Sequence, residues 1–459
     1  MQGEIFGPLE CSISVDTFGK ECVARGQYLY SYKGVDVPPL AMIDDLACVS
    51  TCGIDTVKAN SYLNSKTNLK KLQFGPDKCH KMHIGKKKMY CPDLHIDSWK
   101  MNLMIELETK VYEETDKFEG DTQMEESKEE KYLGDIITDD GLNKKNIDAR
   151  KGKGLGIINQ IKEILHDISF GPSYFEIANL LRHSLFLSSV LLNSEVWYGL
   201  SHTDIEQLEQ VDQALLRMIL EAPSSTPKVS LYLEMGCVPI RFIIKNRRIM
   251  FLHYILHQNE SSLLFKFFNA QLDNPVKGDW SEQVLLDLKE INLQLTLEEI
   301  KNLSKETFRV KLKKAIDGAA LKWLIEEKEK KSKIKSLNYE QLKMQSYLGG
   351  SDLETSDKKF LFQMRCRMID VKSNYKNNHS DLSCALCGTR EDDQKHVMEC
   401  PILINNTSDI STGNMNYDDI FGDDVIKQAK IVRIFRNLWK KRKNLMKEGW
   451  HPNIVSHVI

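Results

Sequence analysis

The stretch "PPLAMIDDLACVSTCG", residues 38–53, decides how the first part of the chain folds. Two carboxylates, Asp44 and Asp45, stand side by side between two apolar runs. Adjacent carboxylates repel each other, and burying them without a counterion is costly. Apolar runs on either side of a polar turn are typical of a β-hairpin. We therefore expect a hairpin with both acids at or near its turn, open to solvent and to a cation.

Two interpretations of the acidic pair remain open on these residues alone. Exposed carboxylates bind Mg²⁺ together with substrate phosphates in many enzymes. Acidic residues are also common in turns and helix caps that have no further role. The dipeptide by itself favours the turn, so the flanking sequence has to decide.

The whole chain has the composition of a soluble globular protein. Its 459 residues, 41% apolar and 28% charged, are enough for about two to four domains. Because the net charge is -2, any nucleic-acid role must rest on local basic patches. The most apolar span, residues 180–200, contains Arg182, His183 and Glu195, and is better explained as a buried helix than as a membrane span.

The N-terminal residues and the cysteines indicate the compartment. The first ten residues, "MQGEIFGPLE", have neither the basic start nor the long apolar run of a signal peptide. The 11 cysteines are odd in number and scattered, unlike a disulfide framework. We therefore expect an intracellular protein, nuclear or cytoplasmic and not secreted, with no membrane partner and with some cysteines free to bind metal.

Residue patterns predict an α+β fold with a strand-rich first part and a helical remainder. Residues 1–141 hold short strand-like runs and an acidic stretch, residues 113–131, that we expect to be a solvated loop or a disordered insert. From there on, apolar residues recur with helical spacing, and the segment 271–360 is rich in lysine and glutamate. Residues 361–459 contain a cysteine/histidine cluster followed by a basic helix.

The cluster "CALCGTREDDQKHVMEC", residues 384–400, is the most specific local motif. Cys384, Cys387, His396 and Cys400 have the spacing C-x2-C-x8-H-x3-C. Three thiolates and one imidazole suit tetrahedral Zn²⁺. Since His396 and Cys400 are four residues apart, one helical turn brings them to the same side. All four coordination positions are then taken by protein, so the predicted Zn²⁺ is structural rather than catalytic.

The segment "DDVIKQAKIVRIFRNLWKKRKNLMKEG", residues 423–449, predicts a basic amphipathic helix. The expected apolar stripe consists of Val425, Ile431, Ile434, Leu438 and Leu445, with Phe435 and Trp439 beside it. The expected positive face consists of Lys427, Lys430, Arg433, Arg436, Lys440, Lys441, Arg442 and Lys443. Asp423 and Asp424 suit the N-terminus of such a helix. This face either contacts phosphates or is only the solvated side of a packing helix.

A second basic segment is "ARKGKGLGIINQI", residues 149–161. It lacks the glycine spacing of a phosphate loop and the strand–glycine–helix context of a dinucleotide site. Arg150, Lys151 and Lys153 either contact a nucleic-acid backbone from a helix N-terminus or belong to an ordinary exposed helix start.

The order of several short motifs resembles the reverse transcriptases of non-LTR retrotransposons. Residues 2–16, "QGEIFGPLECSISVD", resemble motif B, and residues 42–45, "MIDD", resemble motif C with Met42 in place of the usual aromatic residue. Residues 72–79, "LQFGPDKC", resemble motif D, and residues 131–138, "KYLGDIIT", resemble the start of the primer grip. The segments "WYGL" and "STPKVSLYLEMGCVPI" are similar to thumb sequences. The metal cluster is similar to the knuckle of the branch with Dong-like and site-specific elements.

The resemblance covers nearly the whole chain and implies four parts. They are a partial palm of antiparallel strands in residues 1–141, a helical thumb in 142–270, a helical connector in 271–360, and a zinc knuckle with a basic helix in 361–459. It also implies RNA-directed DNA synthesis by a two-metal mechanism with Mg²⁺. The implied partners are an RNA template, a DNA primer or target, and dNTP.

The resemblance also implies roles for single residues. Asp44 would bind Mg²⁺, Asp45 would assist or orient, and Lys78 would neutralise or protonate the departing pyrophosphate. Gly3 would let the backbone approach the nascent base pair. With the basic residues above, the positions expected to contact nucleotide or nucleic acid are Gln2, Gly3, Tyr132, Leu133, Gly134, Arg150, Lys151, Lys153, Arg433, Arg436 and Lys440.

The resemblance does not extend to a complete catalytic site. In the family, the aspartate of motif A bridges both metals and lies upstream of motif B, and neither Asp16 nor Asp55 follows the right motif to replace it. No restriction-like endonuclease motif is evident after Cys400. We therefore expect no primer extension by this chain alone, unless an upstream fragment or partner supplies motif A. Template-dependent extension that is lost in Asp44→Ala would contradict this expectation.

Two other interpretations of the function remain open. The chain could be a zinc-knuckle nucleic-acid-binding protein without catalysis, or a decayed gene product without function. Salt-dependent binding of RNA or DNA without synthesis would favour the binding protein.

Overall fold

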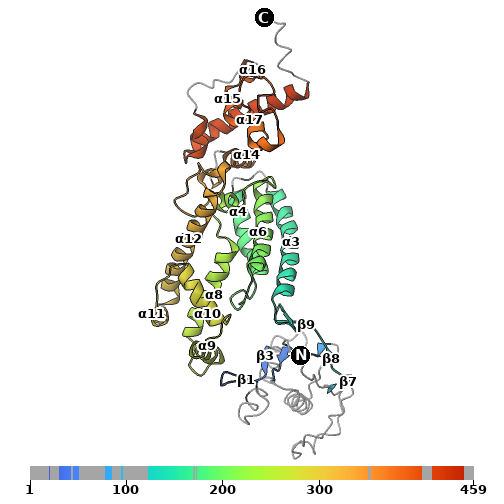
Figure 1. Cartoon of the computed structure of the whole chain (residues 1–459), viewed down its shortest axis with the longest axis vertical. Helices are drawn as coiled ribbons and strands as arrows, with labels where there is room; N and C mark the ends of the chain where they lie inside the picture. The colour runs from blue at the N-terminus through green and yellow to red at the C-terminus, as the bar shows by residue number, and fades with distance from the viewer. Residues whose placement is uncertain are drawn as a thin grey trace, which may run out of the picture.

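The computed structural model describes residues 20, 30–42, 45–50, 78–84, 95–96, 122–168, 171, 173–349, 353–405 and 416–448. These residues are mostly helical and carry a few short strands, which is consistent with the predicted α+β class. The strands lie at one end of an elongated molecule, and α17 (Val425–Lys447) lies near the other end (Figure 1).

The strands pair in twos. The antiparallel pairs are β1 (Tyr30–Tyr32) with β2 (Val35–Val37), β3 (Leu40–Met42) with β4 (Asp45–Ala47), β6 (His95–Ile96) with β7 (Thr122–Gln123), and β9 (Glu129–Tyr132) with β10 (Asp135–Thr138). The parallel pair is β5 (His80–Lys81) with β8 (Glu125–Glu126). Within the described ranges these pairs do not join into one larger sheet, so the polymerase palm stays a prediction.

The hairpin expected around the acidic pair is confirmed. Met42 of β3 lies opposite Asp45 of β4, and only Ile43 and Asp44 stand between the two strands in sequence. Asp45 is exposed, as expected for an acid next to a turn. Asp44 lies outside the described residues.

The motif "KYLGDIIT" also forms a hairpin. Tyr132 at the end of β9 pairs with Asp135 at the start of β10. Leu133 and Gly134 form the two-residue turn with φ of 49° and 91°. Positive φ at both positions is the geometry that matches the twist of paired strands, and glycine adopts it without cost at the second position.

The expectation of a loop over residues 113–131 is wrong for the part of this stretch that the structure describes. Residues 122–131 contribute β7, β8 and most of β9. Strand formation needs only main-chain pairing, and the side chains of Glu125, Glu126 and Glu129 remain exposed. An acidic stretch can therefore form edge strands without burying charge.

Helices make up the rest of the described chain. The first group is α3 (Lys144–Asp167), α4 (Tyr174–Leu181), the π-helix η2 (Arg182–Leu187), α5 (Ser188–Val190), α6 (His202–Leu220) and α7 (Lys228–Met235). The second group is α8 (Ile240–Leu256), α9 (Leu263–Asp273), α10 (Trp280–Glu290), α11 (Leu297–Asn302) and α12 (Lys305–Glu329). The third group is η3 (Ser332–Ile334), α13 (Ser346–Gly349), α14 (Thr355–Arg365), η4 (Lys372–Asn378), α15 (Gln394–Glu399), α16 (Pro401–Asn405), η5 (Tyr417–Phe421) and α17.

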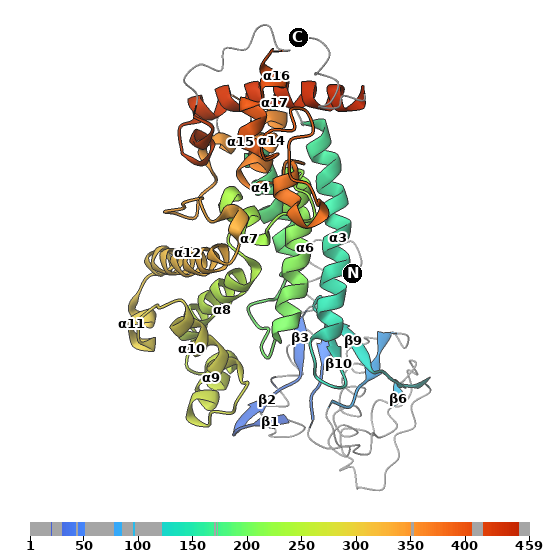
Figure 2. The same ribbon diagram turned by 45° about the horizontal axis from the view of Figure 1, so that its top comes forward.

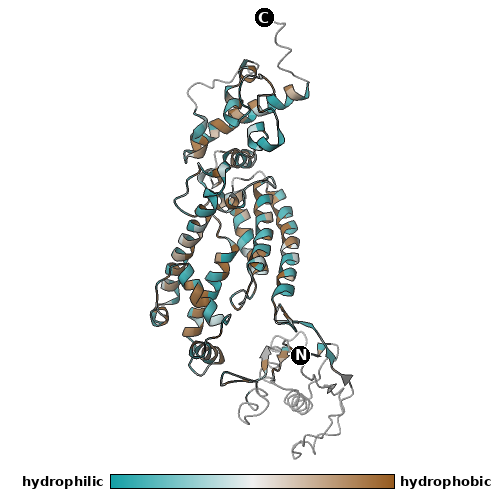
Figure 3. Cartoon of the chain, in the orientation of Figure 1, coloured by the Kyte–Doolittle hydropathy of each residue, from teal (hydrophilic) through white to brown (hydrophobic). Residues whose placement is uncertain are grey.

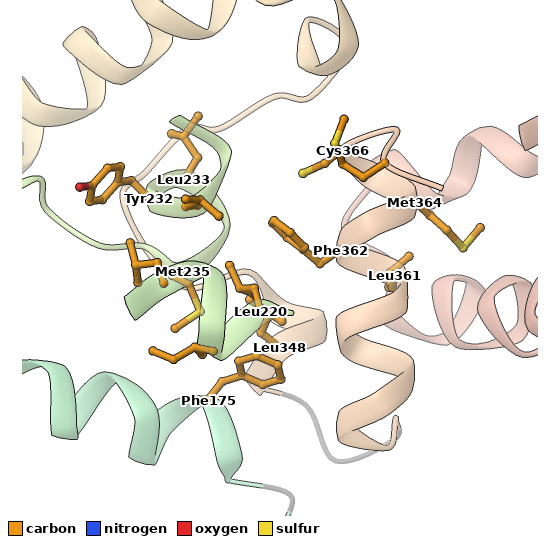
Figure 4. Packing of buried hydrophobic residues seen from close by; sticks show 14 of the residues in the cluster. Phe175, Leu220, Tyr232, Leu233, Met235, Leu348, Leu361, Phe362, Met364 and Cys366 are labelled. Atoms are coloured by element: carbon orange, nitrogen blue, oxygen red, sulfur yellow. The ribbon is translucent and has the colours of Figure 1, made fainter. Parts of the chain in front are cut away.

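The buried apolar residues form two clusters. The first joins helices α3–α7 to α14–α17, so the C-terminal helices share a core with the first helical group. Figure 4 shows Phe362 of α14 pointing toward Leu220, Leu233 and Leu348. The second cluster is built by α8–α12, for example by Ile249 and Phe308. The two clusters therefore do not correspond one to one with the four parts expected from the sequence. That four-part division stays a prediction.

Helices α6 and α17 are amphipathic, as their spacing predicted. Hydrophilic and hydrophobic residues alternate along each of them (Figure 3). The apolar segment 180–200 forms the end of α4, η2, α5 and a following turn, with Phe186 and Val190 fully buried. Among the described residues, none of the helices is both long and apolar enough to cross a bilayer.

A buried polar network ties the third helical group to α7. The carboxylate of Glu234 accepts hydrogen bonds from Tyr339 Oη at 2.7 Å, Tyr347 Oη at 2.8 Å and Arg365 Nε at 3.0 Å. Burial raises the pKa of both tyrosines well above its usual value, which keeps their hydroxyls neutral donors. Arg365 Nη1 also donates to the carbonyl of Ile420 at 2.6 Å. The network therefore fixes α7, α14 and η5 to one another.

Candidate metal centre and basic helix

The four predicted metal ligands come together. The ligand atoms of Cys384, Cys387, His396 and Cys400 all lie within 4.8 Å of one another. Cys384 and Cys387 lie on a tight turn, in which the amide of Gly388 donates to the carbonyl of Cys384 at 2.9 Å. His396 lies in α15, and Cys400 caps the C-terminal end of that helix. The expected helical turn between the last two ligands is confirmed.

Local capping fixes the start of α15 and hence His396. The side chain of Asp393 accepts a hydrogen bond from the amide of His396 at 2.6 Å. A short polar side chain at this position satisfies an amide that the helix itself leaves unpaired. The acidic pair "DD" before His396 therefore has a structural reason, because its second member is the cap.

The cluster fits a metal ion by its chemistry and its burial. Cys384, His396 and Cys400 are buried, and Cys387 is half-buried. Cys387 Sγ lies 3.3 Å from His396 Nε2, which converges two ligand atoms on one point. Three sulfurs and one imidazole nitrogen are the donor set of structural zinc sites, and zinc bound here would cross-link the turn to α15.

Electrostatics at the cluster favours a thiolate. A hydrogen bond from Cys400 lowers the pKa of the Cys384 thiol, burial opposes this shift, and nearby amides and Arg442 add to it. The thiolate is the form of cysteine that binds metal. The same hydrogen bond raises the pKa of the Cys400 thiol, so Cys384 is the acceptor of this pair.

The basic helix α17 has the amphipathic character that its sequence predicts. Its buried face consists of Ala429, Ile431, Val432, Phe435, Leu438, Trp439 and Leu445, and it packs on α14, α15, α16 and η5. Val425 and Ile434 are only half-buried. Asp424 caps the N-terminus by accepting from the amides of Ile426 and Lys427 at 3.1 Å, as expected for an acid at this end.

The basic residues of α17 differ in exposure, because most are exposed, Lys441 is half-buried and Arg442 is buried. The exposed ones are Lys427, Lys430, Arg433, Arg436, Lys440, Lys443 and Lys447. Arg436 forms an ion pair with Asp357. The placement of Arg442 on the positive face was wrong, because its side chain is only 3% exposed and pairs with Asp392. A buried guanidinium needs such a partner, and the partner lies 50 residues away in sequence.

The three basic residues at the start of α3, which were candidates for nucleic-acid contact, also differ in exposure. Arg150 is buried, and its Nη2 donates to Asp135 at 2.6 Å and to the carbonyl of Gly134 at 2.8 Å. Arg150 therefore supports the hairpin. It is not exposed for contact with a nucleic-acid backbone, as its position in sequence had suggested. Lys151 is half-buried and donates to Gln207 at 2.9 Å, whereas Lys153 is exposed.

Asp135 is the centre of a polar clamp that the sequence did not suggest. Besides Arg150, it accepts hydrogen bonds from Asn146 Nδ2 at 3.0 Å and Asn193 Nδ2 at 2.9 Å. Asn193 Nδ2 also donates to the carbonyl of Leu133 at 3.0 Å. The turn of the β9–β10 hairpin is thus held from α3 and from the segment after α5.

The remaining predicted site residues lie in the strand region. Lys78 is exposed, and Tyr132 is half-buried at the end of β9. Burial raises the pKa of Tyr132, and the charge of Asp45 adds to the shift. Gln2, Gly3 and Asp44 lie outside the described residues. The described residues hold no second group of three or more potential metal ligands, and the Mg²⁺ site stays a prediction.

Comparisons with known proteins add no relative. No protein-family model matches the chain, and searches among curated proteins and solved structures found no match either.

Proposed function

We propose that this chain is a part of a non-LTR retrotransposon reverse transcriptase, and that its metal centre and α17 bind nucleic acid. The observation that carries the binding role is the exposed face of α17. This helix of 23 residues contains no acidic residue, and its exposed basic side chains lie opposite the face that packs beside the metal cluster. Such a face attracts phosphates without reading sequence.

Two observations support the reverse transcriptase assignment. The motifs occur in the family's order along the sequence. In addition, the acidic hairpin and the β9–β10 hairpin lie at the same end of the molecule (Figure 1). A palm brings its metal-binding acids and its primer grip together in the same way.

The binding role is tested by charge reversal on α17. We expect Lys430→Glu with Lys440→Glu to weaken binding of RNA or DNA by about tenfold or more, and to reduce the slope of log affinity against log salt by about two. The measurement is fluorescence anisotropy across a salt series. The control is Lys311→Glu with Lys314→Glu on α12, which changes net charge equally at exposed positions. Equal weakening by both double variants would mean that only net charge matters, and would contradict a specific surface.

The polymerase assignment is tested at the hairpin turn. Leu133 is exposed, so a photo-crosslinking residue can replace it without entering a core. We expect it to crosslink to the 3′ end of the primer strand of an RNA–DNA hybrid. The same residue at Val310, an exposed position of α12, should not crosslink. Binding of hybrid with equal crosslinking from both positions would leave a nucleic-acid-binding protein without a primer grip.

A further inference from the structure

Arg442 joins α17 to the metal cluster. Of the basic residues in the described helix α17, it is the buried one, with a side chain 3% exposed. Its Nη1 lies 3.8 Å from Cys384 Sγ, and its Nη2 donates to Asp392 Oδ2 at 2.8 Å. The guanidinium therefore bridges a ligand sulfur and a buried carboxylate.

Asp392 is itself held firmly. Its side chain is 1% exposed and also accepts from the amide of Lys372 at 3.1 Å. Its own amide donates to the carbonyl of Leu382 at 2.8 Å, and its carbonyl accepts from the amide of Ser373 at 3.0 Å. The carboxylate is thus a fixed anchor that orients Arg442 toward the sulfur.

The charges give this bridge a consequence for metal binding. A guanidinium that contacts a ligand sulfur and is itself fixed by a carboxylate holds that sulfur in position for the metal. Asp392 in turn depends on Arg442, because without Arg442 it would be a buried carboxylate without a counterion. The bridge therefore supports the ligand set and the loop that carries it.

The two halves of α17 are attached by different contacts. The first half begins at the Asp424 cap, and its Gln428 Nε2 donates to the carbonyl of Gly422 at 2.6 Å. The second half carries Arg442, together with the apolar contacts of Leu438 and Leu445. The second half therefore carries the side chain that contacts a metal ligand, through Arg442 and Cys384.

We propose that Arg442, oriented by Asp392, couples metal binding at the cluster to docking of the second half of α17. Arg442 is a positioning residue for Cys384, and the loaded cluster in turn holds residues 438–447 in place. The proposal concerns the metal and the helix only, so it stands or fails independently of nucleic-acid binding.

The first test measures metal affinity in the full chain loaded with Zn²⁺. We expect Arg442→Met to weaken Zn²⁺ affinity by about 10–100-fold in competition with a chromophoric chelator, because outer contacts to ligands have effects of this size. The matched control is Arg436→Met, which removes a charge and an ion pair from the same helix without touching the cluster. Arg442→Lys, which keeps the charge but loses the fork of donors, should be intermediate and serves if Arg442→Met does not fold. Wild-type affinity in both Arg442 variants would overturn the proposal.

The second test measures hydrogen exchange along α17. Chelation of the metal should raise exchange of amides 438–447 more than that of amides 425–432, and Arg442→Met should do so even with Zn²⁺ present. Circular dichroism confirms that the remaining helices stay folded. A uniform rise along α17, or no rise, would overturn the coupling.

Discussion

Glu234 receives three hydrogen bonds in the first core, from Tyr339, Tyr347 and Arg365. Its side chain and that of Arg365 are 0% and 1% exposed. At this depth neither charge is solvated, so each depends on the other and on the two tyrosines. This ion pair holds the C-terminal helices against α7, in addition to the apolar core that they share.

We predict that Glu234→Gln lowers the free energy of unfolding by about 3–5 kcal/mol, since it leaves Arg365 as an uncompensated buried charge. Urea denaturation followed by circular dichroism measures the change. The control is Asp317→Asn, which breaks an exposed ion pair with Lys313 on α12 and should change stability by about 0.5 kcal/mol or less. Similar changes in both variants would show that the network contributes no more than a surface pair.

Helix α3 shows at the element scale why three neighbouring glycines are not equivalent. A Cβ on Gly154 would lie 2.9 Å from Val211 Cγ1 and 3.0 Å from Val190 Cγ2, so α3 packs closely on α5 and α6 at this point. Added Cβ atoms on Gly152 and Gly156 would meet nothing within 4 Å. Figure 2 shows α3 lying beside α6 along much of its length. In "GKGLG", Gly154 thus allows close helix packing, whereas Gly152 and Gly156 lie on the exposed face of α3.

We predict opposite signs for alanine at these positions. Gly154→Ala should destabilise the protein by about 1–3 kcal/mol through overpacking. Gly152→Ala and Gly156→Ala should stabilise it by about 0.5–1 kcal/mol, because alanine favours the helix and meets no neighbour. Chemical denaturation of the three variants provides the comparison. A stabilising Gly154→Ala would mean that α3 and α6 are not closely packed.

The larger buried cluster, which joins α3–α7 to α14–α17, determines which parts of the molecule we expect to unfold together. It runs from Ile147 in α3 to Leu445 in α17 and includes Cys384 and Cys400. The metal cluster is therefore not a separate small domain on a linker. Its ligands belong to the same buried cluster as the helices more than 200 residues earlier in the sequence.

We predict that urea releases Zn²⁺ in the same transition that unfolds helices α3–α7. Phe435→Ala, which empties a fully buried site in α17, should lower the midpoints of both events together, with a loss of about 3–5 kcal/mol. Metal release is followed with a chromophoric indicator and helix content by circular dichroism. Release at a clearly lower urea concentration than helix loss would show that the C-terminal region unfolds independently.

Local spacing predicted the features that depend on neighbours in sequence. The hairpin at Asp45, the cap at Asp424 and the convergence of four metal ligands all follow from short sequence motifs, the longest of which runs from Cys384 to Cys400. Arg150 and Arg442 were expected to be exposed, but both are buried. The sequence pattern does not show which basic residue will pair with a carboxylate inside the protein. Asp135 and Asp392 reach them only through tertiary packing, which spacing does not encode.

The polar clamp at Asp135 has a mechanical consequence. It fastens the turn of the β9–β10 hairpin to the first turns of α3, a straight rod of 24 residues and about 36 Å. A tilt of the hairpin by about 10° would swing the far end of that rod by roughly 6 Å if nothing else yielded. A change in the orientation of the hairpin would therefore be transmitted to α3, and through α3 to the helices that pack against it.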